Sequence, residues 1–134
     1  MRQYDVQGIE IRAPRESVLA FVSDPGNLPR WARAFKSADG ERARLETPAG
    51  LVDVSLRTFT NREAGTVDWR IEFPDHAVAL AQSRVTETQR GTSIYSFVLH
   101  APPAPLEQLE GALKQQSATL REELQALKAL LETA

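Results

Sequence analysis

The sequence has no cysteine, a single methionine and only two histidines among its 134 residues. The absence of cysteine excludes a disulfide framework, thiol catalysis and metal sites built on thiolates. Two histidines are too few for a three-histidine metal site. No apolar stretch approaches the length of about 18 residues needed for a membrane span, and the polar start Met1-Arg2-Gln3-Tyr4-Asp5 lacks the apolar segment of a signal peptide. We therefore expect a cytoplasmic protein with no metal and no cofactor.

A strong charge of either sign is also missing. The formal net charge is −2 and the pI is about 5.7, so no overall field would attract nucleic acid or an acidic bilayer. Apolar residues make up 42% and charged residues 25%, which is the composition of an ordinary globular protein. The length predicts one domain that spans residues 1–134.

The N-terminal segment has the pattern of a strand followed by two short helices. Its apolar residues Tyr4, Val6, Ile9 and Ile11 alternate with polar ones except for a phase slip at Gly8, which predicts a β-bulge there. Pro14 then stands where a first helix would begin, and Asp24-Pro25-Gly26-Asn27 would end it. We expect Asn27 to cap a second short helix with Pro29 near its start, which carries Leu28, Trp31 and Phe35.

From about residue 40 to residue 100 the apolar period changes to two, which is typical of strands. The gaps between the runs are a few residues long, enough for hairpins but too short for parallel crossovers, so the sheet should be an antiparallel meander. One face is apolar and the other charged, as expected when one face of a sheet meets a core. The predicted solvent face carries Asp53, Arg57, Asp68, Arg70, Glu72 and Arg84.

The C-terminal segment is one long amphipathic helix of roughly 28 residues, which follows the stiff connector Ala101-Pro102-Pro103-Ala104-Pro105. A sheet with one apolar face needs a cover, and this helix is the only predicted element large enough. The fold class is therefore α+β, with a long helix against an antiparallel sheet. The helix has a leucine stripe at Leu106, Leu109, Leu113, Leu120, Leu124, Leu127 and Leu131.

The N-terminal segment contains a motif made of Ala13-Pro14, Val18, Phe21-Val22, Asp24-Pro25, Asn27, Pro29 and Trp31. This motif and the order of elements resemble the START-like superfamily, also called SRPBCC or the polyketide cyclase/dehydrase and lipid-transport group. The resemblance implies a helix-grip fold, in which a curved antiparallel sheet of six to seven strands surrounds the C-terminal helix and encloses a cavity. Family members bind lipids, sterols, polyketides, aromatic compounds or hormones, and some are cyclases.

A row of small residues gives the best candidate for a ligand site. If Ala79, Ala81, Ser83 and Val85 point inward, their strand adds little volume, so it either lets the helix approach closely or leaves room for a ligand. Large neighbours that fill the space are the alternative, and the inward phase of segments 77–87 and 92–100 is open because Leu80 and Ile94 are also apolar. The candidate ligand-binding residues are Trp69, Ile71, Phe73, Ala79, Ala81, Ser83, Tyr95, Phe97, Leu99, Leu113, Gln116 and Leu120.

Four further residues have both a functional and a structural interpretation. Gln116 interrupts the leucine stripe and would bind a ligand or Tyr95, or lie at a solvent-reaching margin. Trp31 would stack on a ligand or, as aromatic residues at helical spacing usually do, fill the core. His76 and His100 titrate near neutral pH but are expected at the sheet rims, in contact with solvent.

No catalytic motif is present, and no catalytic residue is assigned. The favoured hypothesis is a protein that binds a small hydrophobic or aromatic molecule, as a carrier or sensor. One alternative is a cyclase/dehydratase-like enzyme that uses Tyr95, Gln116 or a histidine. Another is a protein-interaction or stress-response module with a vestigial cavity. Nucleic acid is not an expected partner, and a homodimer remains open.

Overall fold

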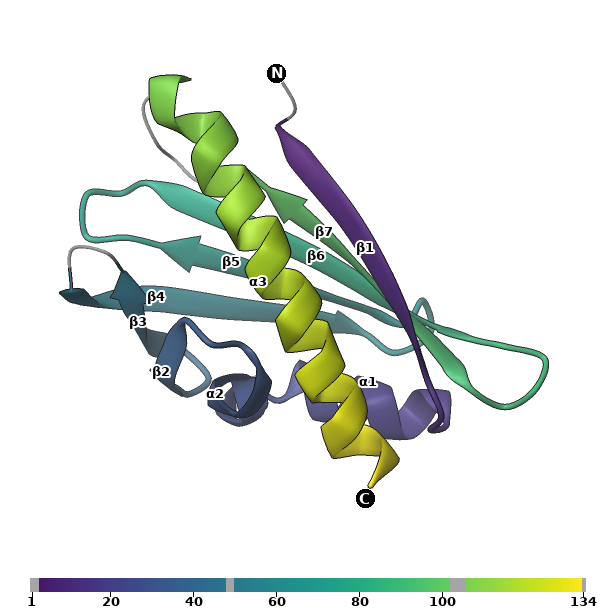
Figure 1. Ribbon diagram of the computed structural model, residues 1–134. Coiled ribbons are helices and arrows are strands. Elements are labelled where there is room, and N and C mark those ends of the chain that lie inside the picture. The colour runs from purple at the N-terminus through teal and green to yellow at the C-terminus, as the bar shows by residue number, and fades with distance from the viewer. Residues whose placement is uncertain (1–2, 48–49, 102–105, 134) are drawn as a thin grey trace.

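The computed structural model describes residues 3–47, 50–101 and 106–133, of which 106–112 are described by their backbone alone. The elements follow the predicted order (Figure 1). They are β1 (Tyr4–Ile11), α1 (Arg15–Ser23), the 3-10 turn η1 (Pro25–Asn27), α2 (Leu28–Trp31), β2 (Phe35–Ala38), β3 (Arg42–Thr47), β4 (Gly50–Asn61), β5 (Thr66–Glu72), β6 (Val78–Glu87), β7 (Ser93–His100) and α3 (Leu106–Glu132).

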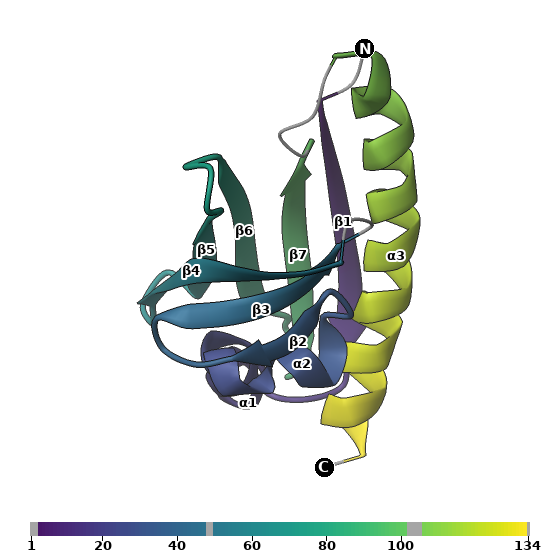
Figure 2. The ribbon, with the colours of Figure 1, turned by 90° about the vertical axis from the view of Figure 1, so that its left-hand side faces the viewer.

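The seven strands form one antiparallel sheet in the order β1-β7-β6-β5-β4-β3-β2. Every strand from β2 onward pairs with its chain neighbour, as short hairpin connections require. The sheet curls so that β4, β3 and β2 turn forward, while α3 runs along the β1 side and faces the concave surface (Figure 2). The predicted α+β architecture with a long C-terminal helix is confirmed.

The short helices close one end of the curled sheet. Asp24 caps η1, because its Oδ1 accepts a hydrogen bond from the Gly26 N–H at 2.9 Å. The prediction that Asn27 caps the second helix is wrong, since Asn27 has helical backbone angles and its amide donates to the Phe21 carbonyl. Phe35 is also misplaced by the sequence pattern. The chain becomes extended at Ala32, so α2 ends at Trp31 and Phe35 begins β2.

The predicted bulge at Gly8 is absent. The β1–β7 register is continuous from Tyr4, opposite His100, to Ile11, opposite Ser93. The inner positions of β1 are therefore Asp5, Gln7, Ile9 and Ile11, while Tyr4 and Val6 are exposed on the outer face. An unbroken ladder keeps all backbone hydrogen bonds to β7, and these bonds outweigh the apolar preference of two side chains.

The core lies between the inner face of the sheet, the short helices and the C-terminal half of α3. The leucine stripe of α3 is confirmed from Leu113 to Leu131 by burial, whereas Leu106 and Leu109 lie outside the described side chains. No described helix is long and apolar enough to cross a membrane. The largest fully buried side chains are Ile11, Val18, Val22, Val54, Leu56, Val67, Val85, Ser93, Tyr95 and Leu127.

Two polar contacts fix the last turns of α3 against the end of β1. The Lys128 Nζ donates to the Glu10 carbonyl oxygen at 2.8 Å. The Arg12 N–H donates to the Glu132 carboxylate at 2.7 Å. The helix thus covers the free backbone edge of β1 at its C-terminal end.

Candidate functional site

The row of small residues on β6 lies on the concave face of the sheet. Ala79, Ala81, Ser83 and Val85 are more buried than the residues between them, which settles the open phase of this strand. On β7 the inward residues are Tyr95, Phe97 and Leu99, whereas Ile94 is exposed on the outer face. The predicted solvent face is confirmed for Asp53, Arg57, Arg70 and Arg84, which are exposed, and Asp68 and Glu72 lie half-buried on the same face.

Large side chains on both neighbouring strands reach over the small row. Ala81 has Trp69 on one side and Leu99 on the other, and Ser83 has Val67 and Phe97. The Trp69 and Phe97 rings stack across β6, with centroids 6.0 Å apart and an interplanar angle of 26°. Above Ala81 and Ser83, the space left by the small side chains is filled by two aromatic rings. In this part of the concave face, large neighbours therefore fill the space that a ligand would need.

Trp31 and Tyr95 extend this contact into a cluster of four rings. The Trp31 ring, brought in by α2, is 6.4 Å from Trp69 and 6.2 Å from Tyr95, and Tyr95 is 6.3 Å from Phe97. Trp31 is 4% exposed, so its interpretation as a buried residue is confirmed. We refer to Trp31, Trp69, Tyr95 and Phe97 as the aromatic cluster.

The aromatic cluster contains polar atoms without hydrogen-bond partners in the described part of the chain. These are the indole nitrogens of Trp31 and Trp69 and the Tyr95 hydroxyl, all fully shielded from solvent. Thr58, which lies opposite Trp69 on β4, has a buried unpaired hydroxyl as well. Buried donors are normally satisfied, and leaving one unpaired costs about 1–3 kcal/mol. A water molecule or a ligand acceptor can supply the missing partner of such groups.

The Tyr95 phenol remains protonated in this setting. Complete burial raises the pKa of Tyr95 well above its ordinary value, and the nearby Asp68 charge adds to this shift. The neighbouring Ser83 hydroxyl, which donates to the Val67 carbonyl at 2.6 Å, acts against it. Tyr95 can therefore donate a hydrogen bond at neutral pH but cannot serve as a general base.

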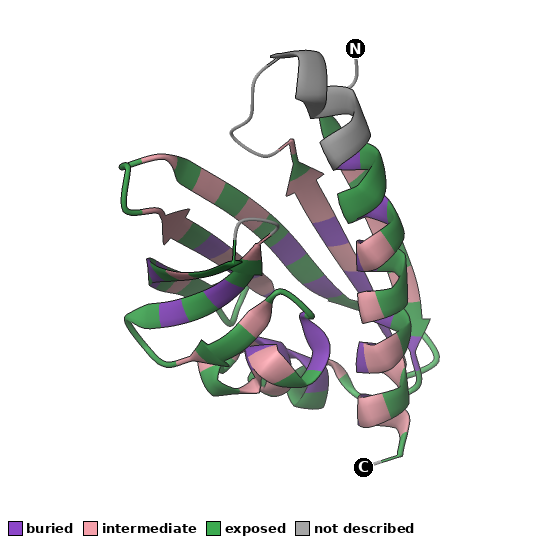
Figure 3. Cartoon of the chain, turned by 60° about the vertical axis from the view of Figure 1, so that its left-hand side comes forward, coloured by how far each residue is buried: buried purple, intermediate pink, exposed green. Residues whose placement is uncertain are grey.

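Beside the aromatic cluster, the concave face becomes partly exposed. Burial decreases along β6 and β7 toward the end of the sheet that is remote from α1 (Figure 3). The residues there are apolar and half-buried, and we call them the apolar rim. The apolar rim consists of Ile71, Phe73, Ala79, Ala81 and Leu99.

On the α3 side, Leu113 and Leu120 are buried, as the stripe predicts. Of the two interpretations of Gln116, the solvent-reaching one is confirmed and the buried one is wrong, because Gln116 is exposed and Ser117 takes the inner position. One residue of helix is 100° of rotation, which is enough to exchange the two. Gln116 lies one heptad before Glu123 and therefore on the same flank of α3. Farther along the helix, this flank faces the end of α2, where Glu123 contacts Arg33.

The two histidines lie outside this site. His76 occupies the β5–β6 turn with a left-handed φ of 69°, is largely exposed, and lies 3.6 Å from the Glu72 carboxylate. His100 is exposed at the end of β7 and bonds the Gln82 amide oxygen at 2.8 Å. The expectation of solvated rim positions is confirmed for both. Among the described residues, no three histidines or carboxylates form a group that could hold a metal ion.

Two polar residues that bear on the chemistry of the site were not identified from the sequence pattern. Thr58 continues the inward phase of Val54 and Leu56, so strand alternation could have found it. No sequence pattern identifies Glu123. Its carboxylate accepts a hydrogen bond from the Arg33 N–H at 2.6 Å, and burial raises its pKa to about 7 against the opposing effect of Arg33.

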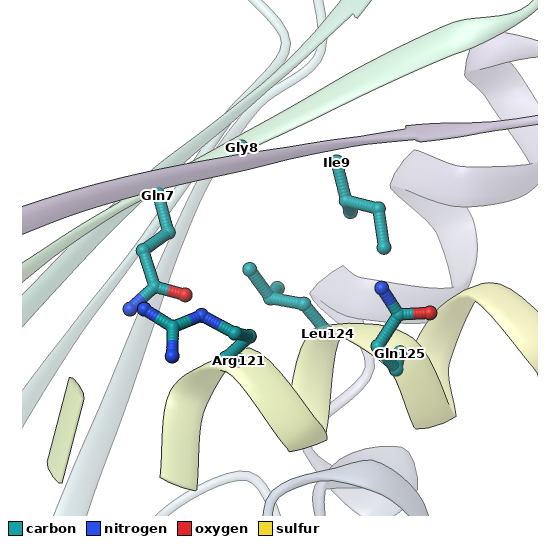
Figure 4. A pocket seen from close by; sticks show the side chains of 6 residues that line it. All are labelled: Gln7, Gly8, Ile9, Arg121, Leu124 and Gln125. Atoms are coloured by element: carbon teal, nitrogen blue, oxygen red, sulfur yellow. The ribbon is translucent and has the colours of Figure 1, made fainter. Parts of the chain in front are cut away.

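An open hollow of about 310 Å³ lies apart from the aromatic cluster, between β1 and α3. Figure 4 shows Gln7, Gly8 and Ile9 on the strand, facing Arg121, Leu124 and Gln125 on the helix. A smaller hollow of about 190 Å³ lies near Ser37 and Arg44 on β2 and β3.

Similar folds occur in several solved structures. The protein XoxI from Bacillus cereus has a TM-score of 0.72 and 18% identity, over 97% of this chain and 96% of that one. A START superfamily protein from Mycobacterium smegmatis has a TM-score of 0.72 and 15% identity, over 98% and 99%. The di-domain ARO/CYC BexL from the BE-7585A biosynthetic pathway has a TM-score of 0.75 and 19% identity, over 96% of this chain but 46% of that one. At these identities the likeness shows a shared START-like fold.

Among curated proteins, none matches the sequence significantly. The profile of one protein family, described as polyketide cyclase / dehydrase and lipid transport, matches residues 5–132, which is nearly the whole chain. The curled sheet, the long C-terminal helix and the fold neighbours agree with this match. The chain therefore belongs to the polyketide cyclase / dehydrase and lipid transport family.

Proposed function

We propose that the protein binds a small, largely apolar molecule that carries a hydrogen-bond-accepting oxygen, and acts as its carrier or sensor. The ligand would lie on the concave face of the sheet, against the apolar rim and the aromatic cluster, with Leu113 and Leu120 of α3 opposite. The observation that carries the proposal is the set of unpaired donors, at Trp31, Trp69 and Tyr95, next to an apolar surface that is partly exposed. Apolar walls with a few placed polar groups are the usual composition of such sites.

The chemistry of the lining defines the class of ligand. The aromatic rings of Trp69 and Phe97 favour a flat hydrocarbon frame, and the unpaired donors are two indole N–H groups and one phenol. An N–H group of tryptophan can only donate, so the ligand must supply an acceptor such as a carbonyl oxygen. A ligand without one would leave the donors unsatisfied, as they are in the free protein.

Titration calorimetry with two probes of the same shape tests this. 9-Fluorenone has a carbonyl oxygen, and fluorene has the same ring frame without it. We expect fluorenone to bind more tightly by about tenfold, since one hydrogen bond from a buried donor is worth roughly 1–1.5 kcal/mol. Trp69→Phe, which keeps an aromatic ring but removes the N–H, should abolish this preference. Equal affinity of the wild type for both probes would contradict the role of the donors.

The position of the ligand is tested with a matched pair of variants. Ala79→Leu adds volume to the apolar rim opposite Ile71 and should weaken fluorenone binding by at least about tenfold. Leu80→Ala changes the next residue of β6, which is 48% exposed on the outer face, and should leave binding unchanged. An Ala79→Leu variant that folds and binds normally would rule out the concave face. Native mass spectrometry of the protein purified from its own host would identify a retained ligand.

A second candidate, a cyclase/dehydratase-like activity, is favoured by one observation. Tyr95 is buried and held protonated, so its hydroxyl can donate a hydrogen bond that polarises a ligand carbonyl. Its test is conversion of a poly-β-ketone probe to an aromatic product, followed by absorbance. Activity that is lost in Tyr95→Phe, while binding of the probe persists, would favour the enzyme over the carrier. The two exposed histidines do not contribute to this candidate.

A further inference from the structure

One stretch of the sheet edge at β1 is left open. The Lys128 ammonium bonds the Glu10 carbonyl, and the Glu132 carboxylate bonds the Arg12 N–H, so even-numbered residues of β1 direct their backbone groups away from β7. The Gln3 carbonyl bonds the Ala101 N–H next to β7, as expected for odd-numbered residues. By this alternation Tyr4, Val6 and Gly8 present their N–H and C=O groups at the edge. In the described part of the chain, these groups have no partner there.

The other sheet edges are protected by the usual means. The opposite edge strand, β2, has only four residues, includes Lys36, and has an irregular register between Phe35 and Ser37. The C-terminal end of β1 is covered by α3. The stretch Tyr4–Gly8 has no lysine, no proline and no bulge, and its one charged side chain, the inward-pointing Asp5, is hydrogen-bonded to Gln7.

The two faces beside this open edge are also suited to contact. On the outer face Tyr4 is 56% exposed and Val6 is 57% exposed, while Gly8 offers no side chain. On the inner face, the hollow of about 310 Å³ lies between β1 and α3 and is lined by Gln7 and Arg121 (Figure 4). The helix contacts this face where the Gln7 amide donates to the Ser117 carbonyl at 2.8 Å, and the hollow lies beside that contact.

We propose that two copies of the protein pair through this edge, as antiparallel β1 strands related by a two-fold axis at Val6. This register places Tyr4 opposite the partner's Gly8, and Val6 opposite the partner's Val6. It is the register in which all three open residues are paired and none meets the stretch that α3 covers. It forms roughly six main-chain hydrogen bonds, two for each of the three pairs. The two sheets become one continuous sheet across both subunits.

Side-chain chemistry supports this register. The Tyr4 ring covers the partner's Gly8, a pairing in which an aromatic side chain shields the exposed backbone of a cross-strand glycine. On the inner face, this register places Asp5 opposite the partner's Gln7. The Asp5 carboxylate keeps its hydrogen bond from Gln7 of its own chain at 2.7 Å. This arrangement occurs twice by symmetry, as an isologous dimer requires.

Analytical ultracentrifugation of the full chain tests the proposal. We expect a mass of about twice 14.9 kDa at concentrations of roughly 1–100 µM, a range in which modest interfaces associate. Val6→Lys brings two like charges together at the axis and should reduce the mass to 14.9 kDa. Ile94→Lys is the matched control, because Ile94 is 42% exposed on the same outer face but lies within the sheet, and it should remain dimeric.

Hydrogen exchange gives a readout that does not depend on a variant folding. The amides of Tyr4, Val6 and Gly8 should be protected at high protein concentration and exchange rapidly on dilution. The amides of the odd-numbered residues of β1, which bond β7, should stay protected throughout. A monomeric wild type, exchange that does not depend on concentration, or a Val6→Lys variant that remains dimeric would each overturn the proposal. Because Val6 does not touch the aromatic cluster, ligand binding is a separate result.

Discussion

Trp69 and Phe97 stack at 6.0 Å although a whole strand, β6, separates the strands that carry them. The contact is made above Ala81 and Ser83, whose small side chains leave the rings free to meet. The concave face thus has two parts: one filled by aromatic rings, the other an apolar rim that stays partly exposed. The small residues of β6 lie beneath both parts, and a ligand has room only against the apolar rim.

Ser83→Val tests the part that is filled. The substitution removes the hydrogen bond to the Val67 carbonyl and adds a methyl group beneath the stacked rings. We expect a loss of stability of about 1–3 kcal/mol, from overpacking and from the lost side-chain hydrogen bond. Urea unfolding followed by circular dichroism measures it. Gln82→Val, on the outer face one residue earlier, should change stability by less than about 0.5 kcal/mol. Equal midpoints for the two variants would show that the stacking does not need the small residue.

Gly65→Ala should be among the most destabilising single-methyl additions. Gly65 has a left-handed φ of 75°, and an added Cβ would lie 2.5 Å from the Val85 carbonyl oxygen. The strain and the backbone clash together predict a loss of more than about 1 kcal/mol in the free energy of unfolding. Gly40→Ala is the control, because nothing lies within 4 Å of its added Cβ. A thermal midpoint that falls as little for Gly65→Ala as for Gly40→Ala would contradict the predicted strain and clash at position 65.

Stability should depend on pH through Glu123. Burial raises its pKa from 4.5 to about 7, so the folded protein holds this proton more tightly than the unfolded chain. The contribution of Glu123 to stability is therefore fully present below pH 4.5 and is lost as the pH rises to about 7. At about 1.4 kcal/mol per pKa unit, and allowing for its partial exposure, we expect a loss of about 2 kcal/mol.

The variant Glu123→Gln separates this effect from other titrations. Its amide oxygen can still accept from the Arg33 N–H but takes no charge. It should match the wild type at pH 4.5 and exceed its stability at pH 8, as measured by urea midpoints at both pH values. Glu63→Gln, in the exposed β4–β5 turn, should follow the wild type at both. A Glu123→Gln variant that is no more stable at pH 8 would disprove the raised pKa.

Tyr95→Phe should separate stability from binding. The Tyr95 hydroxyl is buried without a hydrogen-bond partner, so removing it should leave stability unchanged or raise it by up to about 1 kcal/mol. The same change should weaken fluorenone binding if the hydroxyl donates to the ligand. Thermal unfolding and titration calorimetry on one sample provide both values. A marked loss of stability would instead show that the hydroxyl has a structural partner.

The sequence pattern predicted the architecture well because the elements have clear periods. The two-residue alternation of β5 to β7 and the leucines of α3 each define one buried face, so the antiparallel sheet and its covering helix followed. The N-terminal motif pointed to the correct family. The phase of β6 stayed open until the structure was known, because Ala79 and Leu80 are both apolar and alternation alone cannot choose between them.

The errors arose where neighbouring residues compete for one position. Gly8 was expected to shift the phase of β1, but continuous pairing with β7 leaves Tyr4 and Val6 outside. The break in the leucine stripe at Gln116 leaves two interpretations open, and the structure places Gln116 in solvent and Ser117 on the stripe. The raised pKa of Glu123 depends on burial against a segment that includes Arg33, ninety residues away in the chain, and no local pattern contains that contact.

Both tryptophans of the chain belong to the aromatic cluster, with ring centroids 6.4 Å apart. All indole emission of the protein therefore originates beside the proposed ligand surface, and excitation passes readily between the two rings. Quenching or a spectral shift on adding a compound reports directly on this interior, without any label. Intrinsic tryptophan fluorescence can therefore be used to screen compounds for binding at low protein concentration.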